Sequence, residues 1–200
     1  MRDRDYTLMI DKSGSMMFRD EAGGKSRWEA AQETAFALAA KCEQLDPDGI
    51  TVYLFSGKFK RLENVTSERV PQIFQENEPS GGTYLGAALE HAFADYFQRK
   101  SAKKTKPKGE TILVMTDGAA DDAKIVMKSI IDATRKMDRD EELALCLIQV
   151  GKDAATTRFL NALDDDLTTA GAKFDICDTI TLEDMENTTL TEVLMNAISD

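Results

Sequence analysis

Long apolar runs alternate with segments of helical periodicity along this sequence. The apolar runs that predict strands cover residues 6–10, 50–55, 111–115, 143–150 and 174–180. Most positions in these runs are apolar, without the alternation of a half-exposed strand, so both faces of each strand are expected to be buried. Apolar side chains at spacings of three and four predict helices over 27–45, 69–74, from Thr83 to 96, from Asp121 to 134, 154–163 and 190–198.

The alternation of strands and helices predicts the fold class. Buried strands joined by helices are typical of an α/β fold with a doubly wound, mostly parallel central sheet flanked by helices on both faces. Residues 57–62 are interpreted as a short antiparallel edge strand entered by a hairpin. The 200 residues are enough for one domain, so a single domain over 1–200 is expected.

Charge and cysteine content narrow the classes of partner and compartment. The formal net charge of -11 repels nucleic acid and anionic membranes, so neither is expected as a partner. The three cysteines, Cys42, Cys146 and Cys177, are far apart in apolar surroundings and are expected to be buried thiols in a reducing compartment. The sequence shows no apolar signal segment and no run long enough to span a membrane, which favours a cytoplasmic protein.

Oxygen-bearing side chains at three places are expected at one edge of the sheet. Asp11-Lys12-Ser13-Gly14-Ser15 comes directly after the first strand, Thr83 follows a Gly-Gly break, and Asp117 follows the strand over 111–115. In a doubly wound sheet these positions converge where the strand order reverses. Carboxylates and hydroxyls suit Mg²⁺, with Mn²⁺ or Ca²⁺ as alternatives. The alternative for the Asp11–Ser15 turn alone is local hydrogen bonding, since Asp, Ser and Gly are common in turns.

These residues together resemble the metal-ion-dependent adhesion site of von Willebrand factor type A (VWA) domains. The resemblance covers Asp11-x-Ser13-x-Ser15, the threonine in Gly81-Gly82-Thr83-Tyr84-Leu85 and the aspartate in Thr116-Asp117-Gly118, and so the whole chain in order. It implies that Ser13, Ser15 and Thr83 bind the ion directly and that Asp11 and Asp117 act largely through water. The short form is similar to bacterial stand-alone cytoplasmic members, including those near tellurium-resistance systems.

The function that the resemblance implies is a metal-dependent protein–protein interaction module, not an enzyme. A partner protein would supply an Asp or Glu as the last ligand of the ion. Binding mainly through neutral hydroxyls leaves the ion enough charge to attract that carboxylate. The long loop over 16–26 is a departure from the family pattern: it is expected to shape the choice of partner, or to place Glu21 where it blocks the ion.

Other functions account for fewer of these residues. A magnesium-dependent phosphotransferase of the haloacid-dehalogenase type would use Asp11 as nucleophile. Its general acid would stand at the position of Ser13, whose hydroxyl does not titrate near neutral pH. Gly24-Lys25-Ser26 imitates a phosphate-binding loop, but Arg19 stands where that motif needs glycine. A VWA-like module that has lost its metal is the third alternative.

Overall fold

A computed structural model of the chain, described here for residues 1–199, contains a six-stranded sheet. The strand order is β3-β2-β1-β4-β5-β6; β3 runs antiparallel to β2 and every other neighbouring pair is parallel. The strands are β1 (Asp5–Asp11), β2 (Ile50–Phe55), β3 (Phe59–Val65), β4 (Glu110–Thr116), β5 (Leu143–Gln149) and β6 (Cys177–Thr181). The predicted fold class is therefore confirmed, including the antiparallel edge strand.

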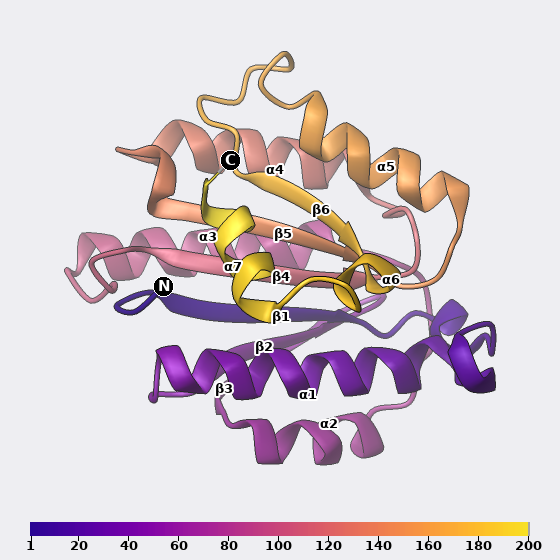
Figure 1. The fold of residues 1–200 in the computed structure, drawn as a ribbon. Helices are drawn as coiled ribbons and strands as arrows, with labels where there is room; N and C mark the ends of the chain where they lie inside the picture. The colour runs from indigo at the N-terminus through magenta and orange to yellow at the C-terminus, as the bar shows by residue number, and fades with distance from the viewer. Residues whose placement is uncertain (200) are drawn as a thin grey trace.

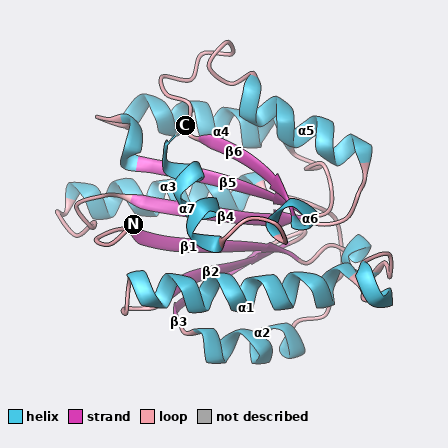
Figure 2. Cartoon of the chain, viewed as in Figure 1, coloured by secondary structure: helices cyan, strands magenta, loops and turns pink. Residues whose placement is uncertain are grey.

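Helices cover both faces of this sheet (Figures 1 and 2). Helices α1, α2 and α7 enclose one apolar core and α3, α4 and α5 enclose the other. Their bounds are α1 (Arg27–Leu45), α2 (Val70–Glu76), α3 (Gly86–Ser101), α4 (Ala123–Lys136), α5 (Ala154–Asp165), α6 (Leu182–Met185) and α7 (Leu190–Ser199). None of the helices in the described part of the chain is long and apolar enough to cross a membrane.

Two expectations about the chain near Thr83 are wrong. Helix α3 begins at Gly86 instead of Thr83, and α4 begins at Ala123 instead of Asp121. Both differences have one cause. Asp121 accepts the Thr83 N–H at 2.8 Å and Asp122 accepts the Gly86 N–H at 3.0 Å. These two carboxylates therefore stabilise the segment that leads into α3, where the sequence pattern assigned them to the first turn of their own helix.

Trp28 and the three cysteines are core residues, whereas His91 lies at the surface. Trp28 is buried against Phe74, with ring centroids 4.2 Å apart. All three cysteines are buried and none forms a disulfide. The exposed His91 contacts the Tyr53 hydroxyl through Nδ1 at 2.9 Å, and the described residues include no group of three or more His, Cys, Asp or Glu that could hold a metal.

Candidate metal site

The candidate site lies where the strand order reverses. From β1 the chain continues to β2 on one side, whereas β4 pairs with β1 on the other. Asp11 is the last residue of β1 and Asp117 directly follows β4, so the two carboxylates belong to neighbouring strand ends. In Figure 1 these ends point to the right, toward the loop that joins β1 to α1. This edge is the usual ligand-binding edge of a doubly wound sheet.

Asp11 is buried and fixed through both carboxylate oxygens. Oδ1 accepts the Ser13 N–H and Oδ2 accepts the Thr116 hydroxyl, each at 2.7 Å. Burial raises the pKa of Asp11 from its ordinary 3.8 to about 6, and the hydrogen bond from Thr116 opposes that rise. The carboxylate thus orients the Asp11–Ser15 turn and adds negative charge at a place that water does not solvate.

The serine hydroxyls and Asp117 form a compact group of oxygens. Ser13 Oγ lies 3.0 Å from Ser15 Oγ, and Ser15 Oγ donates to Asp117 Oδ1 at 2.8 Å. Neighbouring oxygens of an octahedral shell with metal–oxygen distances of 2.0–2.1 Å are about 3 Å apart. The spacing of the two hydroxyls therefore fits adjacent positions around a small hard cation, and Asp117 can act on that cation through the Ser15 hydroxyl.

Thr83 reaches the same edge on a separate loop. Two backbone hydrogen bonds join this loop to the Asp11–Ser15 turn, from Gly14 N–H to Gly81 O at 3.0 Å and from Ser80 N–H to Lys12 O at 2.7 Å. The Thr83 hydroxyl lies beside Gly118, where an added Cβ would be 3.2 Å from Oγ1. The five predicted site residues thus lie at the end of β1, in the turn after it and in two further loops at the same edge of the sheet, with Ser13, Ser15 and Asp117 in direct contact.

Arg27 also belongs to this group, although the sequence pattern predicts it only as the first residue of a helix. From the first position of α1 its Nη1 donates to Asp117 Oδ2 at 2.9 Å. Its Nε and Nη2 donate to the Asp20 carboxylate at 2.9 and 2.5 Å. The hydrogen bonds with Asp20 and Asp117 raise the pKa of Arg27 above its ordinary range, so the guanidinium keeps its charge.

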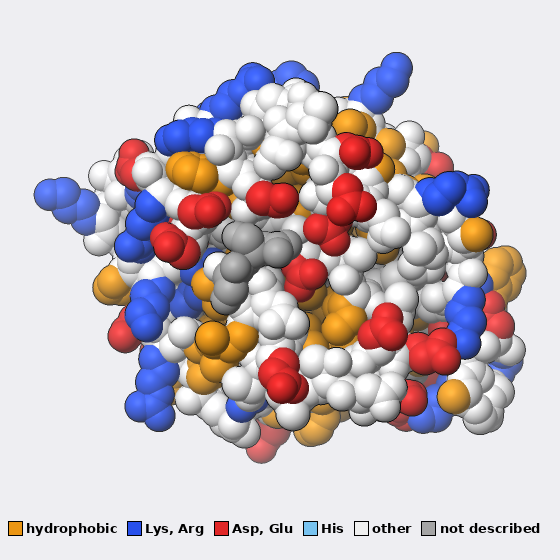
Figure 3. All heavy atoms as spheres, turned by 45° about the horizontal axis from the view of Figure 1, so that its top comes forward, with side chains coloured by type: hydrophobic (Ala, Val, Ile, Leu, Met, Phe, Trp, Pro, Cys, Tyr) orange, Lys and Arg blue, Asp and Glu red, His pale blue; other side chains and the backbone are white. Residues whose placement is uncertain are grey.

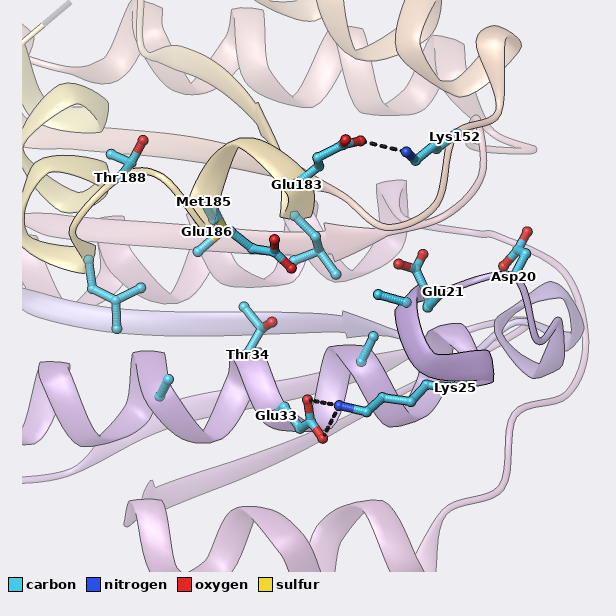
Figure 4. A pocket seen from close by; sticks show the side chains of 15 residues that line it. Asp20, Glu21, Lys25, Glu33, Thr34, Lys152, Glu183, Met185, Glu186 and Thr188 are labelled. Atoms are coloured by element: carbon cyan, nitrogen blue, oxygen red, sulfur yellow. Dashed lines mark hydrogen bonds and ion pairs between the residues drawn. The ribbon is translucent and has the colours of Figure 1, made fainter.

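The loop over 16–26 also borders a groove of about 640 Å³ between α1 and α6 (Figure 4). Glu21 and Glu186 line it, together with two lysines in ion pairs, Lys25 with Glu33 and Lys152 with Glu183. The structure places the Glu21 carboxylate in this groove, and its main chain pairs with Lys25 across the loop. Asp20 is the carboxylate of this loop that is connected to the candidate site, because Arg27 donates to both Asp20 and Asp117.

Comparison with known proteins identifies the family to which this chain belongs. The family model of the von Willebrand factor type A domain matches residues 6–119, which hold all five predicted site residues. The chain therefore belongs to the VWA domain family. No curated protein matches it by sequence.

Solved structures with a similar fold share little sequence with this chain. The first is a mutant of the PilB minor pilin from Streptococcus sanguinis, with a TM-score of 0.65, 14% identity, and coverage of 98% of this chain and 61% of that one. The pilus adhesin SpaC from Lactobacillus rhamnosus GG has a TM-score of 0.61 and 14% identity, with coverage of 98% of this chain and 31% of SpaC. The manganese-loaded TRAP protein of Plasmodium vivax has a TM-score of 0.60 and 15% identity, with coverage of 92% of this chain and 71% of TRAP. This chain thus spans less than two thirds of the length of either pilus protein.

Proposed function

We propose that this VWA domain binds a divalent cation of the Mg²⁺ class at Asp11, Ser13, Ser15, Thr83 and Asp117, and that the cation captures an Asp or Glu side chain of a partner protein. The observation that supports this most is the contact of two hydroxyls with one carboxylate at the switch point of the sheet. Hydroxyl ligands do not neutralise the ion, which therefore keeps a charge that attracts a carboxylate.

The surface around the site supports a protein partner. Met17, Phe18 and Tyr84 are 55%, 60% and 46% exposed. Met17 and Phe18 come shortly after Ser15, and Tyr84 directly follows Thr83. Exposed large apolar side chains around a charged centre are typical of an interface. Acidic side chains are spread across the face drawn in Figure 3, and the net charge is -11. A local cation would thus overcome a repulsion that an acidic partner otherwise meets.

The geometry of Asp11 disfavours the phosphotransferase alternative. A nucleophilic carboxylate must reach its substrate, but Asp11 is fully buried and both of its oxygens accept hydrogen bonds. The residue two positions on is Ser13, which supplies no general acid. Release of phosphate from p-nitrophenyl phosphate by the wild-type protein, lost on Asp11→Ala, would support the enzyme and contradict the binding module.

Titration calorimetry with MgCl₂ tests the metal site. Ser101→Ala is the control, since Ser101 is exposed at the end of α3. The wild-type protein and this control are expected to give the same heat of Mg²⁺ binding, and the double variant Asp11→Ala, Ser13→Ala is expected to give none. N-acetylglutamate amide is then titrated into each protein with and without Mg²⁺. Binding that needs both the metal and the intact site supports the proposal, whereas equal Mg²⁺ heats for the wild-type protein and the double variant would exclude the site.

A further inference from the structure

Arg27 occupies a position at the site that local helix electrostatics disfavours. A cation at the first position of a helix meets the positive end of the helix dipole. Yet the Arg27 side chain is only 10% exposed, and its guanidinium contacts the fully buried Asp117 side chain on one side and Asp20 on the other. The Phe18 ring packs near it, with the guanidinium carbon 5.3 Å from the ring centroid. The surrounding protein therefore holds the charge in this place.

The backbone near Arg27 leaves room for the guanidinium. Gly151 has a φ of +75°, and a Cβ on it would lie 2.8 Å from Arg27 Nε. A side chain at that position would therefore displace the guanidinium. Since Asp117 accepts Arg27 at Oδ2 and Ser15 at Oδ1, neither of its oxygens is left without a donor.

The charges of the site make the consequence specific. Asp11 and Asp117 together balance a divalent cation, so a site with these two charges alone would hold the ion and leave it little attraction for a further anion. Arg27 offsets part of this negative charge, which leaves the ion more positive charge for an incoming carboxylate. Asp20 in turn offsets part of the Arg27 charge, but its side chain is 47% exposed, so solvent weakens its effect at the buried end of the site.

We propose that Arg27 is the positioning residue that sets the affinity of this site for its partner: it holds Asp117 away from direct coordination and preserves the positive charge that captures a carboxylate. This inference rests on the proposed function. It predicts an exchange of affinities. Without the guanidinium charge the metal is bound more tightly and the carboxylate more weakly, because Asp117 becomes free to bind and neutralise the ion.

The test compares the wild-type protein with Arg27→Gln and Arg27→Lys, with Mn²⁺ as the metal and acetate as the carboxylate. Calorimetry gives the Mn²⁺ affinity, and water-proton relaxation of the loaded protein follows acetate as it displaces metal-bound water. Arg27→Gln is expected to bind Mn²⁺ about tenfold more tightly, equivalent to about 1.4 kcal/mol, and acetate several-fold more weakly. Arg27→Lys keeps the charge but not the simultaneous contacts with Asp20 and Asp117, so both of its affinities are expected to lie between those of wild type and Arg27→Gln.

Loss of structure cannot imitate this result, because a damaged site binds metal more weakly. The inference is overturned if Arg27→Gln binds Mn²⁺ no more tightly than wild type, or if Arg27→Lys behaves like the neutral variant. Circular dichroism in EDTA checks that each variant folds; if Arg27→Gln does not, the lysine variant still decides, because loss of acetate binding in a folded Arg27→Lys protein contradicts the role of the charge. Absence of Mn²⁺ binding to the wild-type protein would instead reject the proposed function, and this inference with it.

Discussion

Replacing Thr116 by valine tests the hydrogen bond between its hydroxyl and Asp11. The valine also removes the acceptor of the Gly118 N–H at 3.3 Å, a neutral contact that is lost at every pH. The substitution keeps the shape of the side chain and removes the hydroxyl that donates to Asp11 Oδ2 at 2.7 Å. Both residues are buried, so water does not replace the lost donor. A hydrogen bond to a charged acceptor contributes about 1.5–3 kcal/mol. At pH 8, where Asp11 is ionised, the free energy of unfolding in EDTA is therefore expected to fall by about 2 kcal/mol.

The same substitution is expected to cost less at pH 5. The pKa of Asp11 is about 6, so at pH 5 its carboxyl group is mostly protonated. The Thr116 hydroxyl then serves a neutral acceptor, either the carboxyl group or the Gly118 carbonyl at 3.1 Å, and its loss costs about 1 kcal/mol. Urea denaturation followed by circular dichroism at both pH values measures the difference.

Thr134→Val is the matched control for this measurement. Thr134 is also buried, but its hydroxyl donates to the neutral Ile131 carbonyl at 2.8 Å, so the loss of stability should be the same at pH 5 and pH 8. A cost of Thr116→Val that is no larger at pH 8 than at pH 5, relative to this control, would refute the reasoning that Thr116 stabilises an ionised Asp11.

Two further predictions concern the ionisation of Asp11 and the turn before β4. Because the pKa of Asp11 is raised to about 6, the free energy of unfolding without metal should fall by on the order of 3 kcal/mol as pH rises from about 4 to above 6. Mg²⁺ should therefore raise the melting temperature more at pH 8 than at pH 5. A rise in melting temperature that does not depend on pH would contradict this. Gly109 has a φ of +83°, and an added Cβ would lie 1.9 Å from Glu142 O, so Gly109→Ala should cost at least about 3 kcal/mol in urea denaturation. Gly57→Ala, with no heavy atom within 4 Å of its Cβ, should change stability by less than about 0.5 kcal/mol, and equal effects of the two substitutions would refute the steric argument.

Most of the fold could be predicted from local pattern, because each buried strand must be apolar on both faces. Helix α1 covers the predicted residues 27–45. A capping box of Ser26 and Glu29 fixes its start. The start of α3 could not be predicted in this way. Its flanking donors are satisfied by Asp121 and Asp122, which lie more than thirty residues away in the chain. The four-residue α6 was also missed, because a single turn has no measurable periodicity.

The closeness of the Asp11–Ser15 turn to Asp117 could be predicted because neighbouring strand ends of a parallel sheet share one edge, so a position in the sequence translates into a position in space. Arg27 has no such relation to the strands. Its contact with Asp117 depends on where the first turn of α1 lies relative to the end of β4, which is a matter of tertiary packing. The sequence does contain one local signal, an arginine placed where the helix dipole opposes it. Since a charge that breaks a local rule needs compensation elsewhere, such a residue next to a predicted anionic site is a candidate partner for its carboxylates.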